Sequence, residues 1–184
     1  MIHKSSLHTY VAFLRGINVG GNVLIKMRDL QNVFESAGYV QVRTVLASGN
    51  VLFEAPKSPL PSLTTDIEKL LHKKFGRKIF VVLSTLKDLK NLDAADPFIG
   101  IKVTPETRRY VTVLKTIPKK HIPLPYFSPD KNFRILNESD RTLISVLTLS
   151  PALKTPDVMK LLESTYGKDM TTRNWNTIQK ILKA

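Results

Sequence analysis

Residues 10–22 read Tyr-Val-Ala-Phe-Leu-Arg-Gly-Ile-Asn-Val-Gly-Gly-Asn, and this stretch decides how the N-terminal half folds. The first five residues, 10–14, would be apolar on both faces of a strand, which predicts a buried strand. Residues 15–22 are rich in Gly and Asn, which accept unusual backbone angles, so they predict a loop. The sequence therefore places a Gly- and Asn-rich loop directly at the end of a buried strand.

The segments that follow complete a fold unit. Apolar residues recur at helical or strand spacing, and turn residues separate the runs. The expected elements are a helix over 27–37 that Gly38 ends, strands at 42–47 and 51–54, a helix after a Thr65–Glu68 capping box, a strand at 79–83, and a short helix capped by Ser84. The first six elements follow the order β-α-β-β-α-β of the ferredoxin-like fold. We predict such a unit over residues 1–95.

The second half predicts another α+β unit, over residues 96–184, that packs with the first and ends in two helices. Strands are expected at 110–114, 133–137 and 143–149. Thr155-Pro156-Asp157 is a strong helix start, and Gly167 ends that helix. A final helix is expected to begin near Arg173.

Two loops of the first unit are expected to converge. The crossover helix makes the first two strands parallel, so the first loop and the hairpin after the second strand lie at one edge of the sheet. A guanidinium, amide side chains and Gly-exposed backbone N–H groups would suit a phosphate or carboxylate there. The candidate ligand-binding residues are Arg15, Gly16, Asn18, Gly20, Gly21, Ser48, Gly49 and Asn50. The alternative is that Gly and Asn only form the turns.

A second candidate site lies near the C-terminus, in residues 171–177. Residues typical of helix N-caps would place backbone N–H groups beside Arg173 and Asn174, which favours an anion. The alternative is a capped helix with Trp175 as a core anchor.

Composition limits the function further. Lys and Arg number 28 against 15 Asp and Glu, so the net charge of +13 favours an anionic partner, a small molecule or nucleic acid. The absence of Cys excludes disulfides, thiolate metal sites and a cysteine nucleophile. The four His have no metal-ligand spacing, and the glycines fit neither a P-loop nor a dinucleotide fingerprint, so we expect no metal and no cofactor.

The basic run 73–78 is interpreted as a solvated helix end, with a binding patch as the alternative. No signal-peptide or membrane-span pattern is found, so a cytoplasmic location is expected.

Several motifs together resemble the bacterial proteins grouped as domain of unknown function 1697. They are Phe13–Gly21, Met27 with its helix, Val42-Arg-Thr44, Ser48-Gly-Asn-Val51 with Phe53, and Thr172–Thr177. The resemblance implies a small α+β protein without an assigned activity or catalytic residues. It supports the candidates named above and adds Thr177 to them. The sequence departs from the family pattern at Ala47, where Gln is common, and at residues 151–155, where a Gly-rich segment is common.

Three functions remain open at this point. The first is a binding protein for a phosphorylated or other anionic ligand, a nucleotide or RNA. The second is an enzyme acting on a small anionic substrate, for which the sequence offers no evident general base. The third is a scaffold or interaction protein whose basic charge serves only solubility.

Overall fold

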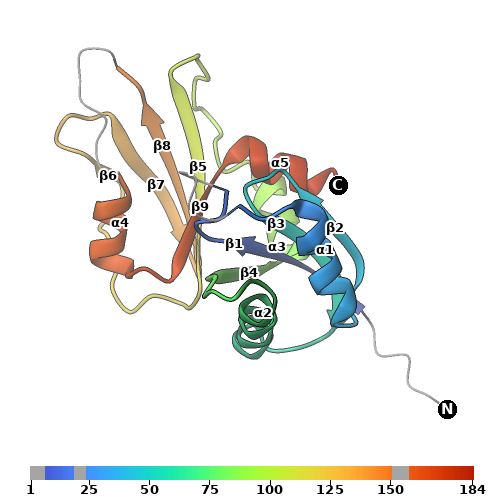
Figure 1. The fold of residues 1–184 in the computed structure, drawn as a ribbon. Coiled ribbons are helices and arrows are strands. Elements are labelled where there is room, and N and C mark those ends of the chain that lie inside the picture. Colours follow the sequence, from blue (N-terminus) through green and yellow to red (C-terminus); the bar gives the residue numbers. More distant parts are fainter. Residues whose placement is uncertain (1–6, 19–23, 151–157) are drawn as a thin grey trace. The chain divides into compact units, whose positions relative to one another are not determined.

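The computed structural model describes residues 7–18, 24–150 and 158–184. Across these ranges the protein is α+β, with two antiparallel sheets and five helices. The chain forms two compact units, Met1–Asn91 with Lys180–Ala184, and Leu92–Gln179. Figure 1 shows one sheet in each unit. None of the helices described is long and apolar enough to cross a membrane.

The N-terminal unit is built on a four-stranded sheet. Its strands are β1 (Leu7–Leu14), β2 (Val40–Val45), β3 (Asn50–Pro56) and β4 (Val81–Thr85). They lie in the order β2-β3-β1-β4, and each neighbouring pair is antiparallel. Helix α1 (Met27–Ser36) joins β1 to β2, α2 (Leu60–Phe75) joins β3 to β4, and α3 (Leu86–Ala94) follows β4.

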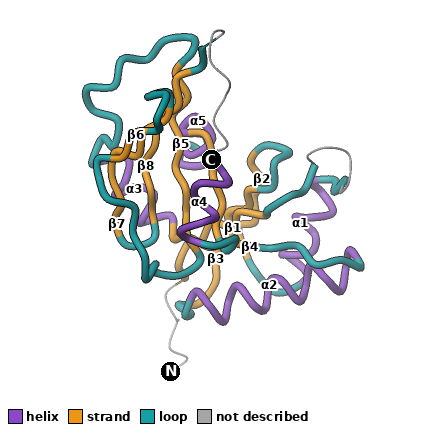
Figure 2. Tube along the Cα trace, turned by 90° about the vertical axis from the view of Figure 1, so that its left-hand side faces the viewer, coloured by secondary structure: helices purple, strands orange, loops and turns teal. Residues whose placement is uncertain are grey.

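The core of this unit lies between one face of the sheet and two helices. Tyr10 and Phe53 are cross-strand partners, and their ring centroids are 5.6 Å apart. Phe34 of α1 and Ile67 of α2 belong to the same buried cluster, so both helices cover the same face (Figures 1 and 2). Because side chains alternate along a strand, every second residue of β1 from Tyr10 faces this core.

The predicted start of the second helix is wrong. Helix α2 begins at Leu60, directly after Pro59, so Thr65 lies inside it and donates to the carbonyl of Pro61. Pro61 is tolerated in the first turn because the N–H groups there have no partners within the helix. Glu68 does not close a capping box but accepts the Val81 N–H at 3.0 Å.

The predicted cap of α3 is displaced by one residue. The hydroxyl oxygen of Thr85 accepts the N–H of Asp88 at 3.0 Å, which is an N-cap bond, whereas the Ser84 side chain makes no such bond. Ser84 is instead a residue of β4, paired with Val11 of β1.

The C-terminal unit contains a five-stranded sheet and one helix that packs on it. The strands are β5 (Thr107–Leu114), β6 (Tyr126–Phe127), β7 (Phe133–Ser139), β8 (Thr142–Thr148) and β9 (Met170–Asn174), in the order β6-β7-β8-β5-β9. Helix α4 (Val158–Tyr166) contributes Leu162 to a buried cluster with Phe133, Ile135 and Met170. The predicted helix start at residues 155–157 lies outside the described residues.

The final helix predicted to begin near Arg173 is present and begins at Trp175, but residues 170–174 before it form strand β9, which the sequence did not predict. This strand pairs with β5, and the helix α5 (Trp175–Leu182) begins only after it. The hydroxyl oxygens of Thr112 and Thr172 are 2.7 Å apart across the pair. Consecutive Thr residues favour an extended strand where a partner strand is available, and the sequence did not reveal that partner. The chain therefore ends helix, strand, helix rather than in two successive helices.

Candidate functional site

Two turns lie against each other at one end of the N-terminal sheet. The Asn18 side-chain amide donates to the Ala47 carbonyl at 2.8 Å, across 29 positions of the chain. The Leu14 N–H donates to the Gly49 carbonyl, also at 2.8 Å. The loop after β1 and the β2–β3 hairpin therefore converge, as the strand order predicted from the sequence requires.

The two turns are interlocked through Gly49. A Cβ at this position would lie 2.5 Å from Ile17 Cδ1 and 3.0 Å from Leu14 Cβ. The φ angle of Gly49 is also +78°, a conformation that other residues rarely adopt. Glycine at this position is thus required by the contact between the turns.

Asn18 holds the first turn in place. Its φ is +55°, and its side-chain amide donates to the carbonyls of Ile25 (3.0 Å) and Ala47 (2.8 Å). Its Oδ1 accepts the Ile25 N–H at 2.8 Å. Both donors of the amide are used inside the protein, so Asn18 offers no free donor to an anion.

Asn50 holds the hairpin in the same way. It is fully buried, and its amide donates to the Val45 carbonyl at 2.7 Å and to Ser48 Oγ at 3.1 Å. Both donors are again used within the turn. Asn18 and Asn50 therefore shape the edge of the sheet, and the charge at that edge comes from other residues.

Arg15 lies beside the start of β4. Its backbone N–H donates to the Phe80 carbonyl at 2.9 Å, and Lys78 Nζ lies 4.7 Å from the centroid of the Phe80 ring. Phe80 is 44% exposed, and Arg77 and Lys78 are exposed. Because α2 ends at Phe75, the last three residues of the basic run 73–78 lie outside the helix. We call Arg15, Arg77, Lys78 and Phe80 the basic edge.

The remaining candidates of the first loop are glycines. Gly16 is exposed and has φ +71°, with nothing within 4 Å of the position of a Cβ. Gly20 and Gly21 lie outside the described residues.

Arg173 belongs to β9 of the C-terminal unit. Its guanidinium donates to Thr171 Oγ1 at 2.7 Å and to the Thr172 carbonyl at 3.2 Å. Burial lowers the pKa of Arg173 to about 10, which leaves the group charged at neutral pH. Arg173 therefore lies in a strand that ends directly before the N-terminus of α5.

Asn174 has the structural role that the sequence left as an alternative. Its Oδ1 accepts the Asn176 N–H at 3.0 Å, so Asn174 caps α5. Trp175 is buried and its ring centroid lies 5.3 Å from that of Phe98, which makes it a core residue. Thr177 lies half-buried in the first turn of the same helix.

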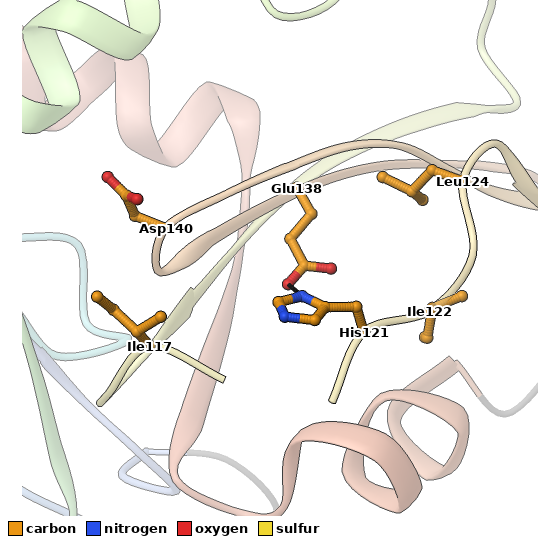
Figure 3. Close-up of a pocket in the computed structure, with 6 residues that line it drawn as sticks. All are labelled: Ile117, His121, Ile122, Leu124, Glu138 and Asp140. Atoms are coloured by element: carbon orange, nitrogen blue, oxygen red, sulfur yellow. Dashed lines mark hydrogen bonds and ion pairs between the residues drawn. The ribbon is translucent and has the colours of Figure 1, made fainter. Parts of the chain in front are cut away.

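A pocket of about 340 Å³ lies in the C-terminal unit, at the end of β7 and the loop that precedes β6 (Figure 3). It is lined by Ile117, His121, Ile122, Leu124, Glu138 and Asp140. His121 and Glu138 point toward each other in Figure 3, and His121 Nδ1 lies 2.7 Å from Glu138 Oε1.

Glu138 connects three parts of this unit. Its Oε2 accepts the Tyr166 hydroxyl at 2.8 Å, and that hydroxyl oxygen accepts the Ile122 N–H at 3.2 Å. Burial, together with the bond to Glu138, raises the pKa of Tyr166 to about 12. The Glu138 side chain is only 8% exposed, so a carboxylate is held inside by a tyrosine and a histidine.

The sequence did not indicate this group. His121 lies in a loop, 17 positions before Glu138, and Tyr166 lies in helix α4, 28 positions after it. Glu138 itself is in strand β7. No spacing pattern connects them. The alternation of β7 indicates at most that Glu138 lies on a face opposite its neighbours, which does not identify its partners.

Comparison with known proteins gives a fold relative and a family. The structure of the conserved bacterial protein SP0830 from Streptococcus pneumoniae has a TM-score of 0.70 at 18% sequence identity, over 97% of this chain and 98% of that one. At this level of sequence identity the likeness shows a shared fold. A search of curated proteins found no match. Residues 7–125 match the family model described as "Protein of unknown function (DUF1697)", and the chain belongs to that family.

Proposed function

We propose that the protein binds a phosphorylated ligand that carries an aromatic base, as a nucleotide or as single-stranded RNA, at the basic edge. The observation that carries the proposal is the 2.9 Å hydrogen bond from the Arg15 N–H to the Phe80 carbonyl. This bond holds the backbone of Arg15 beside that of Phe80, whose partly exposed ring lies 4.7 Å from Lys78 Nζ.

The chemistry of the edge suits both halves of such a ligand. The planar guanidinium of Arg15 can bind two phosphate oxygens, and Lys78 adds a second positive charge. A base can stack on the exposed part of Phe80, a contact that tolerates any base. The net charge of +13 favours the approach of a polyanion.

The other candidates take supporting roles in this proposal. Asn18, Gly49 and Asn50 maintain the turns, as their hydrogen bonds and packing indicate. Gly16 and Ser48 would let a phosphate approach the backbone, and Gly20 and Gly21 lie outside the described residues. Arg173, Asn174 and Thr177 belong to the C-terminal unit, and the proposal does not require them.

The test is a binding titration with a fluorescently labelled oligouridylate at several salt concentrations. Each phosphate contact with a single strand lowers the slope of log K against log salt by about 0.7. The double variant Arg15→Ala, Lys78→Ala should therefore make the slope shallower by about 1.4. Phe80→Ala should weaken binding by about 1–3 kcal/mol and leave the slope unchanged, because stacking involves no counterion.

A matched control is Lys69→Ala, which removes an exposed lysine of α2 outside the basic edge and should have little effect. Uridine monophosphate serves as the competitor: it displaces the strand if one nucleotide suffices and fails if several phosphates are needed. Binding that is insensitive to salt, or a double variant with the wild-type slope, would reject the proposal.

We also propose that the N-terminal unit has the ferredoxin-like fold and that the domains are residues 1–95 and 96–184. The element order β-α-β-β-α-β and the antiparallel order β2-β3-β1-β4 support the first point. The division into two compact units near residue 91 supports the second, with Lys180–Ala184 grouped with the first unit.

A further inference from the structure

We infer that one face of the C-terminal sheet binds single-stranded nucleic acid, with a base stacked on Phe127 and backbone phosphates at Arg134 and Arg109. The three residues belong to the C-terminal unit, so the inference does not rest on the basic edge of the N-terminal unit. It rests on the register of four neighbouring strands, which places the three side chains in one row.

The row runs directly across the sheet. Phe127 of β6 is the partner of Arg134 in β7. Val146 of β8 is the partner of Arg134 on one side and of Arg109 in β5 on the other. The strands β6, β7, β8 and β5 are neighbours in that order (Figures 1 and 2). Because directly opposite residues of antiparallel strands lie on the same side of a sheet, the ring and the two guanidinium groups share one face.

This face is the one opposite helix α4. Tyr126 and Ile135 are the next pair along β6 and β7, and both belong to the cluster that contains Leu162 of α4. Since side chains alternate along a strand, Phe127 and Arg134 point away from that helix.

The face opposite α4 carries positive charge. Arg173 of β9 is the partner of Val111, two residues from Arg109 in β5, so a third arginine lies on this face. Glu138 is the one acidic residue in the five strands of this sheet, all of which the structure describes. It is the partner of Leu143 from the buried cluster and therefore lies on the α4 face. Three arginines without an acid among them favour an anionic partner.

The β6 end of the row is accessible to a ligand. Phe127 is 53% exposed and Arg134 is half-buried. No hydrogen bond, ion pair or ring contact joins either side chain to another residue that the structure describes. At the other end of the row, the Arg109 guanidinium lies 5.4 Å from the centroid of the Phe98 ring, which holds it by a cation–π contact.

The turn between β6 and β7 leaves this charge in place. Asp130 is the acid nearest to the row in the chain, and its carboxylate accepts the Ser128 hydroxyl and the Asn132 N–H. Lys131, directly beside it, is exposed and offsets its charge.

A ring beside guanidinium groups on a sheet suits a single strand. An exposed aromatic ring can stack with any base, and a planar guanidinium can bind two phosphate oxygens. In a duplex the bases are already paired and stacked on one another, so none is available to Phe127. The row therefore favours a single strand over a duplex of the same charge.

The test introduces Phe127→Trp into the full-length protein that also carries Arg15→Ala and Lys78→Ala, so that the basic edge does not contribute. A base of oligouridylate that stacks on the new indole should quench its fluorescence in a saturable way, while Trp175, which is buried, gives a constant background. Ile117→Trp, at an exposed position outside the row, is the control and should not be quenched. Absence of quenching in Phe127→Trp, or equal quenching in the control, would overturn the inference, whereas failure of the basic edge would show only in the salt titration described above.

Variants of the row separate its two contributions. Phe127→Leu should weaken oligouridylate binding by about fivefold or more, because one stacked base is lost. Arg134→Ala should make the salt slope shallower by about 0.7, because one phosphate contact is lost. Arg108→Ala removes the same charge from the α4 face, where its partner is Leu147, and should leave the slope unchanged.

Competition decides whether the ligand is a single strand. Neither inorganic polyphosphate nor duplex RNA should displace oligouridylate as well as unlabelled oligouridylate does. Equal displacement by either competitor, or a wild-type slope in Arg134→Ala, would reject the inference.

Discussion

Gly49 and Ile17 lie so close that a Cβ on Gly49 would be 2.5 Å from Ile17 Cδ1. Since Ile17 is buried, it has little room to move. The contact joins a turn after β1 to a hairpin more than 30 residues later, and the shape of the candidate anion site depends on it. It is therefore the first relationship to test by mutation.

Gly49→Ala should destabilise the protein by about 2–4 kcal/mol, the sum of a left-handed backbone penalty and overpacking. Urea unfolding measures this loss. The control is Gly38→Ala, which has φ +86° but nothing within 4 Å of the Cβ, so it should lose only the backbone part, about 1–2 kcal/mol. Equal losses in the two variants would contradict the packing argument. Because Ile17→Val removes Cδ1, it should recover part of the loss in the double variant.

Asn18→Gly should lose about 1–3 kcal/mol, because the variant accepts the positive φ but lacks the three side-chain hydrogen bonds. Asn18→Ala should lose more, since alanine also disfavours φ +55°. Chemical denaturation of both variants separates the two contributions. A Gly variant as stable as the wild type would show that the hydrogen bonds do not maintain the turn.

Tyr166→Phe should be less stable than the wild type at neutral pH, because Glu138 loses a donor and the Ile122 N–H loses an acceptor. The difference should narrow as pH rises from about 10 to about 12. In that window the unfolded tyrosine loses its proton while the folded one, with its pKa raised to about 12, keeps it, so wild-type stability falls.

The measurement is the free energy of unfolding of both proteins across this pH range. Tyr39 also has a raised pKa, through burial first and Asp66 second, but it is present in both proteins and its effect cancels in the difference. A constant difference between wild type and Tyr166→Phe would show that Tyr166 titrates alike in the folded and unfolded states.

Asn174→Ala should cost about 1 kcal/mol through loss of the α5 cap. Asn174→Asp should keep most of the stability, since a carboxylate oxygen accepts the same N–H and favours a helix N-terminus. Thermal unfolding measures both effects. Asn176→Ala, at the exposed second position of the helix, is the control and should change stability little.

The contact between the two turns could be predicted from the sequence because it follows from chain order. Once residues 10–14 are a buried strand and 27–37 a crossover helix, the loop at Arg15 and the hairpin at Ser48 must lie at one edge. The roles of Asn18 and Asn50 could not be separated in this way. An amide that holds a turn and an amide that binds a ligand have the same sequence signature, and only the hydrogen-bond partners distinguish them.

Local sequence propensity gave a wrong prediction where pairing with a distant strand determined the secondary structure. Thr171 and Thr172 read as helix-capping residues, but pairing with β5 makes them part of a strand. Thr65 and Glu68 fit a capping box, yet the helix had already begun at Leu60. In the first case the competing interaction is pairing with a strand that is distant in the chain. In the second case a proline in the first turn marks the true start of the helix, and the sequence analysis did not recognise its position.

The sequence by itself determined the α+β class, the order of elements in the N-terminal unit and the convergence of the two turns, because apolar periodicity and turn residues are local properties of the chain. Only the tertiary structure decided that Phe80 adjoins Arg15, that Arg173 lies in a strand, and that Glu138 joins His121 to Tyr166. Those relationships are set by strand register and by packing between distant segments, and a linear pattern carries no record of which side chains finally meet.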